Sequence, residues 1–252
     1  MERSRLGLAV DFDGTIAEVV PIPDDARIAP RCAEALARLS RKLTVVSVVS
    51  GRSADDLRSK TGLEGVAYVG NHGAEFIDGG RVTLAPGASA TRDSVRALFE
   101  HLRAAVDSPG LIWEDKGFSA SVHYRLAPAP DEAMRTLSEA LDAAPPVEGV
   151  EVFWGKRVLE LRPATGLNKG YAVRRLVREW RLNGLIFVGD DMTDVDGLRA
   201  LRGLKAEVAL RGLGVAVLYD DSPDELLEWA DYGLDGVPGV EAFLRWLDSV
   251  FG

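Results

Sequence analysis

Cysteine is the scarcest residue type in this 252-residue sequence, which contains a single one, Cys32. An internal disulfide is therefore excluded, and cysteine cannot supply the repeated ligands of a zinc or iron–sulfur site. Cys32, Leu36 and Leu39 share one face of the helix expected for the segment RCAEALARL. We therefore interpret Cys32 as a buried apolar side chain.

Basic residues are fewer than acidic ones, and the sequence has no long apolar run near its N-terminus. Lys and Arg number 30 against 39 Asp and Glu, giving a formal net charge of −9, and the sequence pI is about 5.0. This balance argues against nucleic acid or an anionic membrane as the main partner. The longest apolar run near the N-terminus is too short for the core of a signal peptide or for a membrane span. We expect a cytoplasmic monomer with neither nucleic-acid nor membrane partners.

What the sequence does contain is an apolar run, Leu6 to Val10, that stops on Asp11 and Asp13 before Gly14 and Thr15. Such a run indicates a strand buried on both faces. It would deliver both aspartates to the edge at which open α/β sheets bind their ligands. Two carboxylates this close repel each other unless a cation or a shared proton neutralises them. The alternative, a turn in which the aspartates cap the next segment, accounts for a single Asp-Gly pair better than for the whole DFDGT motif.

The same strand, turn and helix pattern recurs on both sides of a different central region. A helix is expected to open on Pro30, where proline suits the first turn, and another to begin at Ser53, whose hydroxyl can cap it. Apolar runs predict further strands, and several end in polar turns: 43–49 before Ser50-Gly51-Arg52, 66–69 before Gly70-Asn71-His72-Gly73, 185–188 before Gly189-Asp190-Asp191, and 212–219. A helix is expected after Asn168-Lys169-Gly170, and a closing helix over 240–251. Together these segments predict a Rossmann-like parallel sheet.

The central region has the pattern of an inserted α+β unit. Helices are expected over 91–106 and 132–143, and apolar and polar residues alternate from Phe118 to Leu126. Alternation returns in EVFW and RVLELRP, where Leu159 and Leu161 oppose Glu160 and Arg162. This pattern is typical of an antiparallel sheet with one solvated face. With 252 residues, 46% of them hydrophobic, the chain is long enough for one large domain or two small ones.

Four strand-end turns carry groups capable of chemistry, and a parallel sheet would gather them at one edge. They hold Asp11, Asp13 and Thr15; Ser50; Lys169; and Asp190, Asp191 and Asp194. Converging carboxylates provide the hard oxygen ligands that suit Mg²⁺, while a hydroxyl and an ammonium can hold phosphoryl oxygens. Taken singly, Ser50 could be an ordinary turn residue and Lys169 a solvated lysine at a helix start.

These four turns resemble the motifs of the haloacid dehalogenase (HAD) superfamily of phosphotransferases. Over nearly its whole length the chain looks like the trehalose-6-phosphate phosphatase family, because KGFSASVHYR at 116–125 and LELRP at 159–163 accompany the motifs shared by the superfamily. The resemblance implies an α/β fold: a Rossmann-like HAD core formed by residues 1–86 and 164–252. Residues 87–163 would form the inserted α+β cap, which determines substrate specificity.

The resemblance also implies roles for individual residues. Asp11 would be the nucleophile and Asp13 the general acid and base, while Ser50 and Lys169 hold the phosphoryl group. Mg²⁺ would be held by Asp11, the backbone carbonyl of Asp13, Asp190 and Asp194; whether Asp191 is a ligand stays open. The substrate, a small sugar phosphate, would be contacted in the core by Thr15, Gly51, Arg52, Asn71, His72 and Asn168, and in the cap by Glu114, Lys116, His123, Arg125 and Glu160.

Three alternative functions remain at this point. The same architecture serves phosphatases of sucrose phosphate and of mannosyl- or glucosyl-3-phosphoglycerate. A catalytically inactive sensor on the same fold should have lost one of the core acidic groups or the lysine, and none is lost. A dinucleotide-binding protein is disfavoured because no G-x-G-x-x-G follows the first expected strand. For the cap residues, a solvated sheet face is the alternative explanation.

Overall fold

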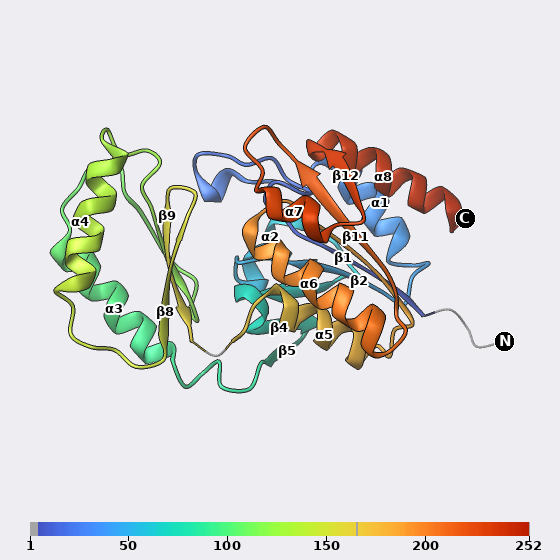
Figure 1. Cartoon of the computed structure of the whole chain (residues 1–252), viewed down its shortest axis with the longest axis horizontal. Helices are drawn as coiled ribbons and strands as arrows, with labels where there is room; N and C mark the ends of the chain where they lie inside the picture. The colour runs from blue at the N-terminus through green and yellow to red at the C-terminus, as the bar shows by residue number, and fades with distance from the viewer. Residues whose placement is uncertain (1–4, 165, 252) are drawn as a thin grey trace. The chain divides into compact units, whose positions relative to one another are not determined.

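A computed structural model describes residues 5–164 and 166–251. The chain divides into two compact units (Figure 1), a larger one made of Met1–Thr83 and Leu167–Gly252 and a smaller one made of Leu84–Gly166. Among the described helices, none combines the length and the apolar character needed to cross a bilayer.

The larger unit contains an eight-stranded sheet with the strand order β12-β11-β10-β1-β2-β3-β4-β5. The six strands from β12 to β3 run parallel, and β4 is antiparallel to β3. The bounds are β1 (Leu6–Val10), β2 (Val45–Val49), β3 (Ala67–Gly70), β4 (Glu75–Asp78), β5 (Arg81–Leu84), β10 (Gly184–Gly189), β11 (Arg211–Leu218) and β12 (Tyr232–Asp235). The predicted α/β class with a parallel sheet is confirmed. Strands β4, β5 and β12 are additions that the apolar patterns did not indicate, since all three are short and rich in polar residues.

Helices cover both faces of this sheet (Figure 1). Their bounds are α1 (Pro30–Leu39), α2 (Ala54–Thr61), α5 (Lys169–Glu179), α6 (Met192–Glu207), α7 (Asp224–Trp229) and α8 (Gly236–Val250), with 3-10 turns η1 (Pro23–Asp25) and η2 (Asn71–Gly73). One core cluster lies between the sheet and α1, α2 and α8, and a second lies between the sheet and α5, α6 and α7. The predicted cap of α2 is confirmed, because the Ser53 side chain accepts a hydrogen bond from the Asp56 amide.

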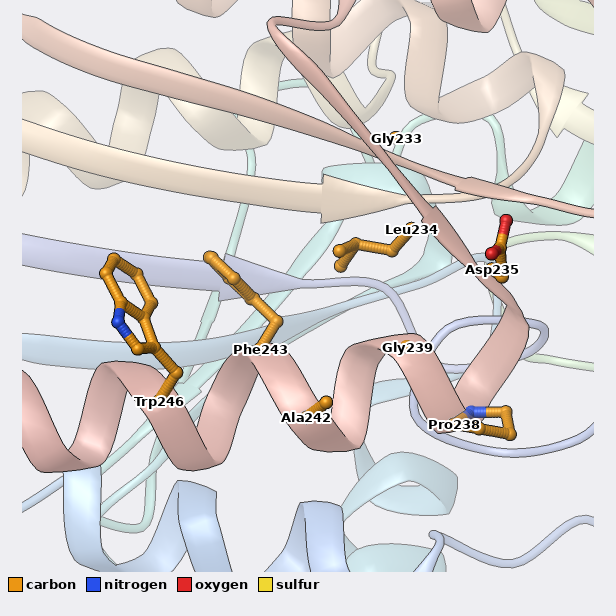
Figure 2. Close-up of a pocket in the computed structure, with 8 residues that line it drawn as sticks. All are labelled: Gly233, Leu234, Asp235, Pro238, Gly239, Ala242, Phe243 and Trp246. Carbon is orange, nitrogen blue, oxygen red and sulfur yellow. The ribbon is translucent and has the colours of Figure 1, made fainter.

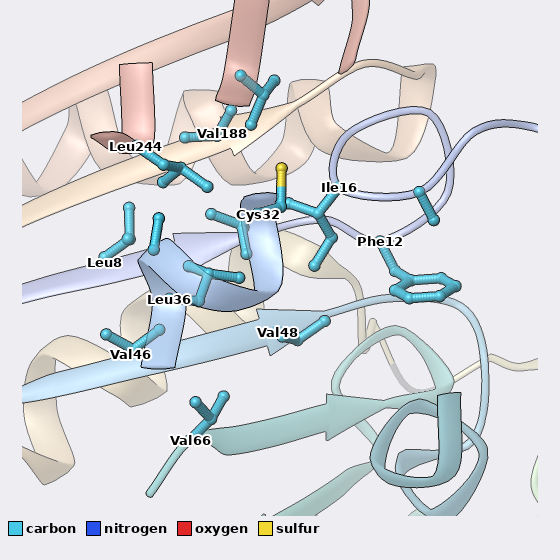
Figure 3. Close-up of a cluster of buried hydrophobic side chains, with 14 of the residues drawn as sticks. Leu8, Phe12, Ile16, Cys32, Leu36, Val46, Val48, Val66, Val188 and Leu244 are labelled. Atoms are coloured by element: carbon cyan, nitrogen blue, oxygen red, sulfur yellow. The ribbon is translucent and has the colours of Figure 1, made fainter. Parts of the chain in front are cut away.

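The first core cluster anchors the segment that follows β1. Cys32 and Leu36 of α1 lie in one cluster with Leu8 and Val48 of the strands (Figure 3), and Cys32 is fully buried, as predicted. Phe12 belongs to the same cluster and is also fully buried. Because Phe12 separates the two aspartates of the DFDGT motif, its burial fixes the backbone that carries both of them.

A cavity of about 540 Å³ lies between β12 and α8 in the larger unit (Figure 2). Its walls are mainly apolar and are formed by Gly233, Leu234, Asp235, Pro238, Gly239, Ala242, Phe243 and Trp246. None of the residues predicted to take part in chemistry lines it. We therefore place the candidate site elsewhere in this unit.

The smaller unit is an antiparallel sheet packed on two helices. Its strands are β6 (Ile112–Asp115), β7 (Ala120–His123), β8 (Val150–Gly155) and β9 (Val158–Pro163), in the order β6-β7-β9-β8, and its helices are α3 (Arg92–Ala105) and α4 (Pro130–Asp142). Val122, Leu159 and Leu161 are fully buried in a core that includes Leu102 and Leu137 of the two helices. The alternation in the sequence therefore predicted correctly that Val122, Leu159 and Leu161 face the core of this unit.

The opposite face of β7 differs from the prediction of a solvated surface. Ser119, Ser121 and His123 are 3%, 1% and 9% exposed. Ser121 lies in register between Glu114 on β6 and Glu160 on β9. These long side chains flank a strand of small residues, and their polar groups pair with neighbours, so the face is polar but largely buried.

Candidate active site

Three carboxylates converge beyond the ends of β1 and β10. Asp11 follows β1 and Asp190 follows β10, its parallel neighbour, and the ladder continues to Asp11, whose amide donates to the Val188 carbonyl at 2.9 Å. Asp194 lies in the first turn of α6. One side-chain oxygen from each of Asp11, Asp190 and Asp194 lies within 4.8 Å of the others. Adjacent strand ends thus bring together residues nearly 180 positions apart in the chain.

Lys169 lies among these carboxylates. Its Nζ is 2.9 Å from Asp11 Oδ1 and 2.8 Å from Asp194 Oδ1, and the side chain is 2% exposed. Burial by itself would lower the pKa of Lys169, but Asp11 and Asp194 outweigh it and hold that pKa well above its usual value. The alternative of a solvated lysine is therefore excluded. The preceding residue, Asn168, is the N-cap of α5. Its side chain accepts a hydrogen bond from the Tyr171 amide at 2.9 Å, which fixes the start of the helix that carries Lys169.

The carboxylates carry more negative charge than this lysine neutralises. Burial raises the pKa of Asp11 to about 6, with Lys169 opposing the rise and Asp191 adding to it. Burial also raises the pKa values of Asp190 and Asp194 well above the ordinary range, and the neighbouring carboxylates contribute in both cases. A cluster whose ionised form is this unfavourable gains stability from a bound cation. Its hard oxygen ligands fit a divalent metal such as Mg²⁺.

The Gly14-Thr15 segment packs directly against Asp190. Thr15 Oγ1 donates a hydrogen bond to Asp190 Oδ1 at 3.0 Å. Gly14 has a φ of +78°, and a Cβ at this position would collide with the Asp190 carboxylate. Glycine is therefore required here both for its backbone conformation and for the close approach of the carboxylate. The structure places Thr15 against a candidate metal ligand, while its predicted contact with substrate stays a prediction.

Asp13 has a different partner from Asp11. Arg52 holds its carboxylate with two hydrogen bonds, from Nε at 2.7 Å and from Nη2 at 2.8 Å, and the same guanidinium binds Asp56 Oδ2 at 3.0 Å. The Arg52 side chain is 8% exposed and that of Asp13 is 36% exposed. The guanidinium expected to contact substrate is thus occupied by Asp13 and Asp56. The role of the Asp13 backbone carbonyl as a metal ligand stays a prediction.

The turns after β2 and β3 are joined to each other. His72 donates its amide to the Ser50 carbonyl at 3.1 Å, and Asn71 donates its amide to the Arg52 carbonyl at 2.7 Å. Asn71 and His72 have left-handed backbones, with φ of 48° and 54°. Gly51 lies against the imidazole, since a Cβ there would be 2.6 Å from His72 Nε2. Ser50 is buried beside this junction, and its predicted contact with phosphate is not tested by these contacts.

In the smaller unit, the polar face predicted from alternation forms one charged cluster. Lys116 Nζ is 3.7 Å from Glu114 Oε2 and 3.9 Å from Glu160 Oε1. His123 Nε2 is 3.1 Å from Glu114 Oε2. Arg162 Nε donates to Glu160 Oε2 at 2.8 Å. Arg125 follows β7 and is partly buried. Glu114, Lys116, His123 and Glu160 are thus joined in one cluster of acidic and basic side chains, while a place for Arg125 beside them stays a prediction.

A family model described as trehalose-phosphatase matches residues 9–223 of the sequence. The chain belongs to the trehalose-phosphatase family. Trehalose-phosphate phosphatase from Mycobacterium avium (strain 104) is 31% identical over 227 residues, which cover 85% of this chain and 55% of the relative. The protein of the same name from Mycobacterium bovis (strain BCG / Pasteur 1173P2) is 30% identical over 246 residues, covering 92% and 59%. The chain therefore spans a little over half the length of these curated relatives.

Solved structures of the family share the fold of this chain. A crystal structure titled trehalose-6-phosphate phosphatase related protein has a TM-score of 0.78 at 22% identity and covers 97% of both chains. The C-terminal domain of Candida albicans trehalose-6-phosphate phosphatase has a TM-score of 0.78 at 23% identity, covering 98% of this chain and 93% of that one. A HAD-like hydrolase from Bacteroides thetaiotaomicron has a TM-score of 0.66 at 17% identity, covering 97% and 100%. These likenesses confirm the HAD-like fold.

Three further residues make contacts around the site; the sequence left the role of Asp191 open and assigned none to Asp56 and Tyr219. Asp191 is the N-cap of α6, where its carboxylate accepts hydrogen bonds from the Thr193 and Asp194 amides. A D-x-x-D pattern is a recognisable signal for this capping box. Asp56 binds Arg52, and Tyr219 donates its hydroxyl to the Gly14 carbonyl at 2.8 Å. The Arg52–Asp56 pair has the i,i+4 spacing that a sequence pattern can encode. The contact between Tyr219 and Gly14 spans 205 positions, so only the folded chain reveals it.

Proposed function

We propose that this chain is an Mg²⁺-dependent phosphatase that hydrolyses trehalose 6-phosphate to trehalose and inorganic phosphate. The observation that carries the proposal is the group formed by Asp11, Asp190, Asp194 and Lys169, in a chain of the trehalose-phosphatase family. A nucleophilic carboxylate beside a buried ammonium and further carboxylates provides the parts that phosphoryl transfer requires.

Magnesium would be held by Asp11 and Asp190, by the backbone carbonyl of Asp13, and by Asp194 directly or through water. When bound, Mg²⁺ supplies positive charge that offsets the carboxylates and the phosphate and aligns the phosphoryl group. The close spacing of the three carboxylates and their raised pKa values support this assignment.

In the first proposed step, a carboxylate oxygen of Asp11 attacks the phosphorus atom. A phosphorus–oxygen bond to Asp11 forms, the bond from phosphorus to the sugar oxygen breaks, and Asp13 gives its proton to that oxygen. Lys169 and Ser50 hold phosphoryl oxygens, which stabilises the charge of the transition state. Arg52 binds both carboxylate oxygens of Asp13, so Asp13 must exchange this partner for the leaving oxygen in order to act as an acid.

In the second proposed step, water attacks the phosphorus of the aspartyl-phosphate. Asp13 accepts a proton from this water, the bond between phosphorus and Asp11 breaks, and inorganic phosphate leaves. Asp11 returns to its ionised form and Asp13 to its protonated form, so the cycle can repeat. The exposed third of the Asp13 side chain is consistent with access for both water and sugar.

The smaller unit is proposed to act as the cap, and its charged cluster to bind hydroxyl groups of the sugar. Glu114, Lys116, His123, Arg125 and Glu160 present the alternating charges and hydrogen-bonding groups that such recognition needs. Binding energy from this remote part of the substrate would help to exclude water from the reacting centre. In the core, Gly51, Asn71, His72 and Asn168 are proposed to shape the wall around the phosphate.

Substitution of Glu160 tests the proposed role of the cap. We expect Glu160→Ala to lower kcat/KM for trehalose 6-phosphate by roughly thirtyfold to a thousandfold, the range typical of losing a buried charged contact. Hydrolysis of p-nitrophenyl phosphate should be almost unchanged, because this ester contains no sugar that could reach the cap. Initial rates of phosphate and nitrophenol release measure the two effects.

Two further variants serve as controls for this test. Glu160→Gln keeps the size of the side chain and a partner for Arg162, and it should reproduce the selective loss if the charge itself is needed. Glu151→Ala, on the exposed edge strand β8, should leave both substrates unaffected. Equal damage to both substrates by Glu160→Ala would show that Glu160 supports the fold instead.

A substrate panel tests the function as a whole. Phosphate release would be measured from trehalose 6-phosphate, sucrose 6-phosphate, glucosyl- and mannosyl-3-phosphoglycerate, and glucose 6-phosphate. We expect the highest kcat/KM for trehalose 6-phosphate. A higher value for another sugar phosphate would reassign the substrate, and no release from any of them would favour a non-catalytic sensor.

A further inference from the structure

Tyr219 connects the end of β11 to the segment that carries the nucleophile. Its hydroxyl donates a hydrogen bond to the Gly14 carbonyl at 2.8 Å, across 205 positions of the sequence. In the sheet, β10 lies between β11 and β1. The side chain therefore reaches past the end of β10, where Asp190 lies, to contact the segment after β1.

The Gly14 peptide lies between Tyr219 on one side and Asp190 on the other. Its carbonyl accepts the tyrosine hydroxyl, and its α-carbon is in such close contact with the Asp190 carboxylate that a Cβ would not fit. The next residue, Thr15, donates to Asp190 Oδ1 at 3.0 Å. A displacement of the Gly14 carbonyl would therefore move the hydroxyl that orients Asp190.

Tyr219 is itself held from several directions. Its amide donates to Ser222 Oγ at 2.8 Å, and the Ser222 amide donates back to the Tyr219 carbonyl at 3.1 Å. The ring lies against Gly236, where a Cβ would be 3.4 Å from Cε1, at the start of α8. The turn from β12 into α8 can be followed between Asp235 and Pro238 in Figure 2. The contacts with Ser222 thus hold the backbone of Tyr219, and the start of α8 lies against its ring.

The hydroxyl of Tyr219 also keeps its proton at neutral pH. Burial raises its pKa to about 12, Asp190 and Glu18 add to the rise, and a hydrogen bond from the Val237 backbone opposes it. A protonated phenol can donate to a carbonyl, whereas a phenolate cannot. The hydroxyl can therefore donate to the Gly14 carbonyl at neutral pH.

We infer that Tyr219 is a positioning residue for the metal site, holding Gly14 so that Thr15 keeps the Asp190 carboxylate directed toward Asp11 and Asp194. The inference rests on the proposed function, since it concerns the Mg²⁺ site of that proposal. The hydrogen bonds of Tyr219 go to Gly14 and Ser222, and neither residue is a proposed metal ligand. Its effect passes through two hydrogen bonds, one to Gly14 and one from Thr15.

Tyr219→Phe removes the hydroxyl and keeps the ring, and Mg²⁺ binding without substrate is the decisive measurement. We expect isothermal titration calorimetry to show an increase in the Kd for Mg²⁺ of about three- to tenfold, the effect typical of losing one hydrogen bond. Turnover should need correspondingly more Mg²⁺, and excess Mg²⁺ should restore most of kcat. Tyr232→Phe is the matched control, because Tyr232 lies on the neighbouring strand β12 and is 67% exposed.

A double-mutant cycle with Thr15→Val separates this role from a general structural one. If Tyr219 acts through Thr15, the double variant should bind Mg²⁺ about as weakly as Thr15→Val alone, whereas independent effects would multiply. Multiplying effects would overturn the inference. So would a Tyr219→Phe protein that unfolds at a lower temperature in EDTA but binds Mg²⁺ as tightly as the wild type.

The wild-type titration distinguishes failure of this inference from failure of the proposed function. If the wild-type protein binds no Mg²⁺ at millimolar concentrations, the proposed metal site is wrong, and the inference falls with it. If the wild type binds Mg²⁺ and releases phosphate while Tyr219→Phe matches it in both respects, only the inference is wrong.

Discussion

Asp11→Asn is expected to lower kcat for trehalose 6-phosphate by about 10⁴- to 10⁶-fold, the scale of losing a covalent nucleophile. Asparagine keeps the size of the side chain, but its amide cannot attack phosphorus to form a stable acyl phosphate. Binding of the sugar phosphate should survive, because the proposed sugar contacts lie in the smaller unit. Single-turnover phosphate release measures the loss, and mass spectrometry of the variant excludes deamidation back to aspartate.

The same variant should be more stable than the wild type in the absence of metal. Burial raises the pKa of Asp11 to about 6 in the folded protein from an ordinary value of 3.8, so above pH 6 the folded state bears the cost of an unfavourable ionised group. Asparagine removes this charge, and we expect a gain of about 3 kcal/mol in the free energy of unfolding at pH 7.5 in EDTA. The gain should fade as the pH drops through 6 toward 4, because Asp11 then takes up a proton.

Asp25→Asn is the control, since Asp25 is exposed on the turn η1 and should change neither turnover nor the pH dependence of stability. Two outcomes would contradict the assignment of Asp11. One is turnover within tenfold of the wild type in a variant shown to be free of deamidation. The other is labelled phosphate trapped on a different residue of the wild-type protein.

Removal of divalent metal is expected to reduce phosphate release to about 1% or less of its full rate. Asp11, Asp190 and Asp194 lie within 4.8 Å of one another, and Lys169 supplies a single positive charge to them. A phosphate dianion entering this group without a further cation would meet strong repulsion. Dialysis against EDTA followed by rate measurements tests the expectation, and added Mg²⁺ should restore the rate.

Calcium and Mg²⁺-saturated EDTA serve as the two controls for this experiment. Ca²⁺ prefers more ligands at longer distances than Mg²⁺, so it should restore less activity at equal concentration. EDTA that is already saturated with Mg²⁺ should not inhibit. Full activity in protein that elemental analysis shows to be free of metal would contradict a metal-dependent mechanism.

Much of the larger unit could be predicted because its signals are local. The apolar runs that become β1, β2 and β10 are buried on both faces, so their apolar character is nearly continuous and easy to recognise. Ser53 caps α2 through a contact three residues away, a distance that a sequence pattern can encode. By contrast, β12 is a four-residue edge strand with exposed ends, and its place in the sheet depends on pairing with β11.

The smaller unit shows where local patterns mislead. Alternation correctly separated the two faces of β7 and β9, but it assigned the polar face to solvent. Ser121 is 1% exposed because Glu114 and Glu160 flank it in the sheet. Strand pairing decides which side chains lie next to each other, and pairing partners are separated by variable loops that alternation does not record.

The sequence by itself determined the fold class and the residue types at the candidate site, because strand periodicity and the groups that follow each strand are written within short segments. Only the tertiary structure decided the partners. It gave Lys169 to Asp11 and Asp194, Arg52 to Asp13, and the Tyr219 hydroxyl to Gly14. Each of these contacts joins residues 25 to 205 positions apart. Their energy depends on distance and burial in the folded chain, and neither quantity exists until the strands have taken their order in the sheet.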